Sequence, residues 1–137
     1  MRVFTIAAII GAATMITSTA LITPGWAGEA DVVGVRMTEN GGSYRFSVTV
    51  RHADAGWDHY ADKWEVVTPD GKVIDTRVLA HPHDNEQPFT RSLGGVRIPA
   101  GLANVRIRAH DKVHGYGGRE MEVDLKTGKA GPAGGQS

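Results

Sequence analysis

The chain has 137 residues, with 15 lysines and arginines balancing 15 aspartates and glutamates, six histidines and no cysteine. This length suits one domain with a modest hydrophobic core. The lack of cysteine excludes disulfides, thiolate metal sites and cysteine nucleophiles. The sequence has neither a basic stripe for nucleic acid nor a basic amphipathic helix for a membrane surface.

The chain begins with the pattern of a secretory signal peptide. Arg2 provides a positive start, and residues 3–16 form an apolar run too short to span a bilayer. Gly25 and Ala27 are the small residues expected just before a cleavage site. A cut after Ala30 and an uncleaved anchor are the alternatives. No cysteine follows the apolar run, so lipoprotein processing there is excluded. We expect a periplasmic or secreted protein with no stable membrane insertion after cleavage.

Beyond this segment, apolar residues alternate with period two, and no long helical period appears. The alternating segments are residues 33–37, 44–50, 64–67, 72–79, 89–98, 105–109 and 121–125. Turn sequences rich in glycine, proline and asparagine separate several of them. Short strands at this spacing predict an all-β domain, an immunoglobulin-like antiparallel β-sandwich of about seven strands.

These patterns divide the chain into three segments. Residues 1–27 are the predicted signal peptide, and residues 28–126 are the predicted sandwich. Residues 127–137 are rich in glycine and poor in apolar residues, so we expect a disordered tail.

The six histidines all lie in or beside alternate connections of the predicted sandwich. Successive connections of an antiparallel sandwich lie at opposite ends of the domain. The first, third and fifth are tight turns without histidine, whereas the second, fourth and sixth are the longer segments 53–62, 81–88 and 111–118. We therefore expect all the histidines at one end. A chain reversal at Gly94-Gly95, in place of a β-bulge, would move the last loop to the opposite end.

Imidazoles with carboxylates beside them are the donors of divalent metal sites. His81 and His83 are the most suggestive pair, because they lie one residue apart on a segment that Pro82 stiffens. His110 and His114 form the second pair, and their loop ends in the glycine-rich run Gly115 to Gly118. The complete set of candidate ligands is His52, His59, His81, His83, His110, His114, Asp58 and Asp111. Nitrogen and oxygen donors without sulfur favour Cu²⁺ or Zn²⁺.

Two of these histidines have a simpler interpretation. His52 continues the inward-facing alternation of residues 44–50, which predicts a buried histidine that caps the core through hydrogen bonds. His59 lies between Trp57 and Tyr60, whose rings we expect to close the top of the core. Both histidines stay candidates for the wall of a pocket.

Three runs, His52 to Trp64, His81 to Ser92 and Ala109 to Gly118, resemble a family of small exported bacterial proteins of uncharacterised function. This resemblance covers most of the mature chain and implies no activity. The chain is also loosely similar to periplasmic copper-carrier sandwiches of the CopC type, which share its size, its export and copper ligation by histidine and aspartate. It lacks their histidine at the mature N-terminus, so the analogy extends only to fold and compartment.

The leading hypothesis is a periplasmic sandwich that binds Cu²⁺ or Zn²⁺ for carriage, buffering or sensing. The alternative is a non-enzymatic module that binds a protein or ligand through the same loops, with Trp57, Tyr60 and Tyr116 as anchors. A metal-dependent enzyme is the less favoured third hypothesis, because it needs three protein ligands and an open position. A fourth is a hydrogen-bonded cap that only stabilises the loops. The expected partners are a divalent metal ion and another periplasmic protein, and not nucleic acid.

Overall fold

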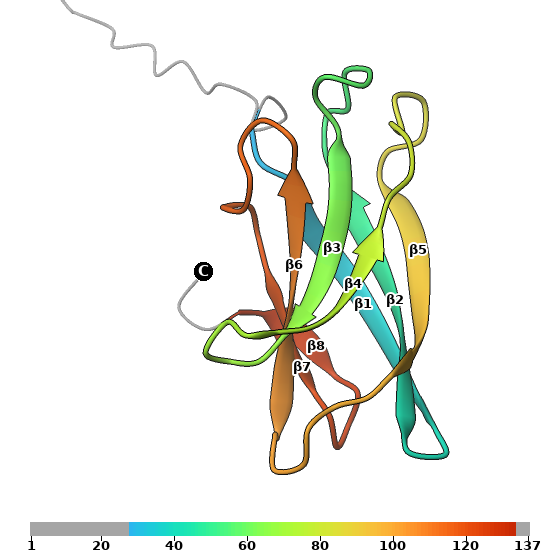
Figure 1. Ribbon diagram of the computed structural model, residues 1–137, viewed down its shortest axis with the longest axis vertical. Helices are drawn as coiled ribbons and strands as arrows, with labels where there is room; N and C mark the ends of the chain where they lie inside the picture. The colour runs from blue at the N-terminus through green and yellow to red at the C-terminus, as the bar shows by residue number, and fades with distance from the viewer. Residues whose placement is uncertain (1–27, 134–137) are drawn as a thin grey trace, which may run out of the picture.

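The computed structural model describes residues 28–133, so the predicted signal peptide and residues 134–137 lie outside the described part of the chain. Two antiparallel sheets pack face to face, which confirms the all-β sandwich (Figure 1). The strands are β1 (Asp31–Asn40), β2 (Ser43–Arg51), β3 (Ala61–Val67), β4 (Val73–Val78), β5 (Phe89–Val96), β6 (Asn104–Asp111), β7 (Met121–Asp124) and β8 (Ala130–Pro132).

One sheet has the order β1-β2-β5 and the other has the order β4-β3-β6-β7-β8. The first seven strands therefore follow an immunoglobulin-like arrangement in which the fourth strand has joined the sheet of the third and sixth. The described part of the chain has one strand more than the sequence predicted. β8 lies within the segment expected to be a disordered tail, and it pairs with β7 between Glu122 and Gly131. Its composition gave no signal because backbone pairing at a sheet edge requires no apolar side chain.

Every second side chain of β2 and β6 points into the core, as period two predicts. The buried side chains of these strands are Phe46, Val48 and Val50 from β2 and Val105, Ile107 and Ala109 from β6. The next inward positions are His52, one residue beyond the end of β2, and Asp111, the last residue of β6, and both are buried. The alternation that builds the core thus also places an imidazole and a carboxylate at its end.

The three loops that carry histidine lie at the same end of the sandwich, at the top of Figure 1. β5 passes through Gly94-Gly95 without reversing, because its pairing with β2 continues to Val96 after a register shift between Tyr44 and Phe46. Gly95 adopts a φ of 67°, which favours glycine at this bulge. The loop after β6 therefore lies at the same end of the sandwich as the other two histidine loops, as the sequence predicted.

Candidate metal centre

His52 and Asp111 meet across the two sheets at the end of the core. His52 Nε2 lies 3.5 Å from Asp111 Oδ2, and both side chains are fully buried. Neither atom has a hydrogen-bond partner among residues 28–133. A buried polar atom without a partner is costly, and a buried carboxylate more so, unless a cation or a donor compensates it. A cation held between these two atoms, or a proton on His52 Nε2, would compensate them.

Two further imidazoles close around Asp111 from the solvent side. His59 Nε2 lies 3.6 Å from Asp111 Oδ1, and His114 Nδ1 lies 3.3 Å from the same oxygen. The two imidazole nitrogens are 3.2 Å apart. The side chains of His59 and His114 are 22% and 32% exposed, so an ion from solvent can reach this half of the cluster.

The spacing of these donors suits one metal ion. Zinc binds histidine nitrogen at about 2.0–2.1 Å, so neighbouring donors around a tetrahedral ion are roughly 3.3 Å apart. His59 Nε2 and His114 Nδ1 are 3.2 Å apart and lie 3.6 and 3.3 Å from Asp111 Oδ1, whereas His52 Nε2 lies 3.5 Å from the other oxygen, Oδ2. Donor atoms of His52, His59 and Asp111 also lie within 4.8 Å of one another. The cluster of His52, His59, Asp111 and His114 is hereafter called the metal centre.

The loop after β6 folds around the Asp111 carboxylate. Oδ1 accepts hydrogen bonds from the backbone N–H groups of Val113 (2.8 Å) and His114 (2.6 Å), which turns the chain back towards its own strand. Gly115, with a φ of 69°, completes the return through reciprocal backbone hydrogen bonds with Asp111. One carboxylate oxygen therefore shapes the loop, and Oδ2 is left for a ligand.

Asp54 holds the opposite side of His52. Its Oδ1 lies 2.6 Å from His52 Nδ1 and also accepts the backbone N–H of Ala61. Its Oδ2 accepts the backbone N–H of His83 at 2.6 Å. Burial alone would raise the pKa of Asp54, but these hydrogen bonds outweigh it, with His52 first among them, and lower the pKa. Asp54 is therefore a stable carboxylate.

The predicted pair His81 and His83 lies apart from the metal centre. His83 is buried, stacks on Phe89 with ring centroids 3.9 Å apart, and accepts a hydrogen bond at Nε2 from Arg91 Nη2. Burial lowers the pKa of His83, and the positive charge of Arg91 and the neighbouring His81 lower it further. His81 is exposed, and its Nδ1 lies 3.0 Å from the carbonyl of Pro82.

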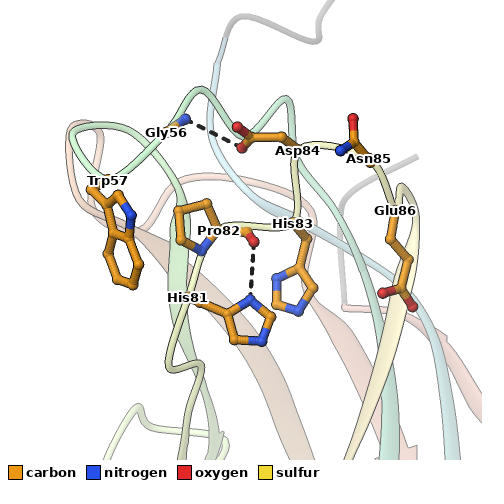
Figure 2. Close-up of a pocket in the computed structure, with 8 residues that line it drawn as sticks. All are labelled: Gly56, Trp57, His81, Pro82, His83, Asp84, Asn85 and Glu86. Atoms are coloured by element: carbon orange, nitrogen blue, oxygen red, sulfur yellow. Dashed lines mark hydrogen bonds between the residues drawn. The ribbon is translucent and has the colours of Figure 1, made fainter.

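His81 and His83 line an open cleft of about 510 Å³ beside the metal centre, with Trp57 on one side (Figure 2). Gly56 donates its backbone N–H to Asp84 across the cleft, which joins the loop of His59 to the loop of His83. The cleft and the metal centre therefore share one loop.

The remaining predicted ligands lie in three different parts of the structure. His110 lies one position before Asp111 and so faces the outer surface of its sheet, where Nδ1 lies 2.6 Å from Asp62 Oδ1. Its partner in the predicted pair, His114, belongs to the metal centre. Asp58 is exposed on the loop before β3. His52, for which we favoured a capping role, is buried as expected and also supplies a donor atom.

Asp54 is the residue of this cluster that the predicted set of ligands left out. Its position two residues after the inward-facing His52 was the available signal, because that spacing lets the carboxylate reach back to the ring. The loop fold that allows this contact could not be read from the sequence.

A protein of Halomicrobium mukohataei named "Putative lipoprotein" is 46% identical to this chain over 101 residues, which are 73% of this chain and 49% of the relative. The chain thus spans about half the length of the relative it matches.

No family model and no solved structure matches. The comparison with copper carriers of the CopC type stays a prediction. Residues 28–133 contain no helix long and apolar enough to cross a membrane.

Proposed function

We propose that this protein is an exported β-sandwich that binds one divalent transition metal ion through the metal centre. The observation that carries the proposal is the pair of His52 Nε2 and Asp111 Oδ2, which are buried, 3.5 Å apart and without hydrogen-bond partners in the described part of the chain. Leaving a buried polar group unpaired costs about 1–3 kcal/mol, and more for a charged group. A metal ion between the two atoms would remove this cost for both.

The donor set favours Zn²⁺ or Cu²⁺. Three imidazoles and one carboxylate provide nitrogen and oxygen without sulfur, which suits these ions. Calcium is disfavoured because it takes six to eight oxygen ligands. The separations close to 3.3 Å suit the tetrahedral geometry of zinc.

A role in carriage or buffering fits better than catalysis. Catalytic zinc keeps an open position beside three protein ligands, whereas here His114 lies beside His59 and Asp111 and would serve as a fourth donor. His59 and His114 are partly exposed, which gives the ion a path to solvent. The pattern of residues 1–27 and the relative named as a lipoprotein both support export. This chain has no cysteine that could carry a thioether-linked lipid.

One observation favours a second function, the binding of a protein or small ligand at the cleft. Trp57 lines the cleft and is 62% exposed. The other two proposed anchors do not line the cleft. Tyr60 is buried with its ring against Trp57, and Tyr116 is exposed but lies 4.1 Å from the guanidinium of Arg108. We therefore rank this function second.

The decisive experiment measures metal binding in two matched double variants. The protein is recovered after export of the full chain and titrated with Zn²⁺ and with Cu²⁺ by calorimetry, and the bound metal is counted. We expect one ion per chain in the wild type. The variant His59→Ala/His114→Ala should lose binding, and His81→Ala/His110→Ala should keep it. No binding at micromolar metal by the folded wild type, or loss only in the second variant, would overturn the proposal.

A further inference from the structure

The hydrogen bond between His52 and Asp54 determines which ring nitrogen of His52 can bind a metal. A carboxylate only accepts hydrogen bonds, so the nitrogen that faces Asp54 Oδ1 at 2.6 Å must carry a proton. A neutral imidazole has a single N–H group. In the neutral form, which is the form that binds a metal, His52 therefore carries its proton at Nδ1, and the lone pair lies on Nε2, the atom that faces Asp111.

We propose that Asp54 is a positioning residue of the metal centre, which selects the tautomer of His52 and fixes the direction of Nε2. This inference rests on the proposed function. Histidine ligands of metals commonly donate their other N–H to a carboxylate, which orients the ring and makes it a stronger donor. Asp54 would touch no metal ion itself and would act through His52.

The Asp54 carboxylate is held in place from several directions. Ala61 donates its backbone N–H to Oδ1, and His83 donates its backbone N–H to Oδ2. Asp54 joins the end of β2 to the start of β3 and to the loop before β5, so its orientation is set by three separate segments. A carboxylate fixed in this way would keep His52 Nε2 aimed at Asp111 before any metal arrives.

A second histidine behind Asp54 extends this arrangement towards the surface. Arg91 donates to His83 Nε2 at 2.9 Å, so the single N–H of a neutral His83 is at Nδ1. That atom is buried, lies 3.8 Å from Asp54 Oδ2 and has no hydrogen-bond partner among the residues that the structure describes. Arg91, His83, Asp54 and His52 thus form a row that ends at the metal centre.

The chain provides a matched control for Asp54. Asp62 and His110 form a second Asp–His pair with the same 2.6 Å separation between Oδ1 and Nδ1. This pair lies on the outer face of its sheet and is partly exposed, away from Asp111. The variants Asp54→Asn and Asp62→Asn therefore make the same chemical change to the same kind of pair, inside and outside the proposed site.

The test measures the Zn²⁺ and Cu²⁺ affinities of wild type, Asp54→Asn and Asp62→Asn by competition with a coloured chelator. We expect Asp54→Asn to bind about 10- to 100-fold more weakly, the usual range for loss of a carboxylate behind a histidine ligand. Asp62→Asn should stay close to wild type. Equal affinities for wild type and Asp54→Asn, or equal losses in both variants, would overturn the role of Asp54.

A measurement on the wild type keeps the inference testable if Asp54→Asn fails to fold. Nitrogen NMR of the metal-free protein, above the ordinary titration range of histidine, reports which nitrogen of His52 carries the proton. A proton on Nδ1 is expected, and a proton on Nε2 alone would overturn the inference. A wild type that binds no metal would overturn the proposed function instead, and this result is distinct from the other two.

Discussion

His52 Nε2 and Asp111 Oδ2 face each other across the sandwich at 3.5 Å, at the point where the inward alternation of β2 meets that of β6. Each residue lies two positions beyond the last apolar side chain of its strand, Val50 in one sheet and Ala109 in the other. The metal centre is therefore a continuation of the core, with polar atoms in place of apolar ones.

The substitution Asp111→Asn should separate metal binding from stability. The amide oxygen can still accept the N–H groups of Val113 and His114, and the amide nitrogen can donate to His52 Nε2. We expect metal affinity to fall at least about tenfold, and the free energy of unfolding of the metal-free protein to rise on the order of 1 kcal/mol. Calorimetric titration and urea unfolding measure the two effects. A large loss of stability would instead favour a charged His52–Asp111 pair whose role is only to cap the core.

Metal should stabilise the folded protein. An ion that binds only the folded state adds about 2.7 kcal/mol when its free concentration is 100 times the dissociation constant. For a domain of this size that corresponds to a rise in Tm on the order of 10 °C. Thermal unfolding with Zn²⁺, and again after a chelator is added, checks this. The same shift in His59→Ala/His114→Ala would show that the ion binds elsewhere.

His83 should make stability depend on pH. Burial, Arg91 and His81 lower its pKa below the ordinary value of about 6.5. The unfolded chain then binds a proton more readily than the folded one, so stability is complete above the unfolded pKa and declines as pH falls through it towards the folded pKa. Urea unfolding of the metal-free protein at a series of pH values should show this decline. It should be smaller in His83→Gln, which cannot take up the proton, and an unchanged slope would contradict the assignment.

Gly118 should not tolerate a side chain. A Cβ atom there would lie 2.0 Å from the carbonyl oxygen of Ala30, so the loop after β6 could not rest against the start of β1. Gly118→Ala should lower the free energy of unfolding by about 1–3 kcal/mol, the usual cost of overpacking. Gly131→Ala is the control, since a Cβ atom there meets no atom of the described residues within 4 Å. Similar unfolding midpoints for the two variants would disprove the steric argument.

The sequence by itself determined the sandwich and the shared end of its histidine loops. Period-two alternation is a local property of strands, so it showed which side chains of residues 44–50 and 105–109 face inward without knowledge of their neighbours. Because neighbouring strands are antiparallel, successive connections lie at opposite ends of the domain, which places the histidine loops together. β8 escaped prediction because it depends on backbone pairing with β7, a contact that leaves no pattern in side chains.

Only the tertiary structure decided which histidines come together. His110 and Asp111 are adjacent in sequence, but the pleat of β6 turns one outward to Asp62 and the other inward to His52. His59 and His114 meet because their loops fold back over the end of the core. His83 lies apart from them, with its ring stacked on Phe89. Such distances depend on how two sheets and three loops pack together, and that packing is set by contacts between residues far apart in the chain.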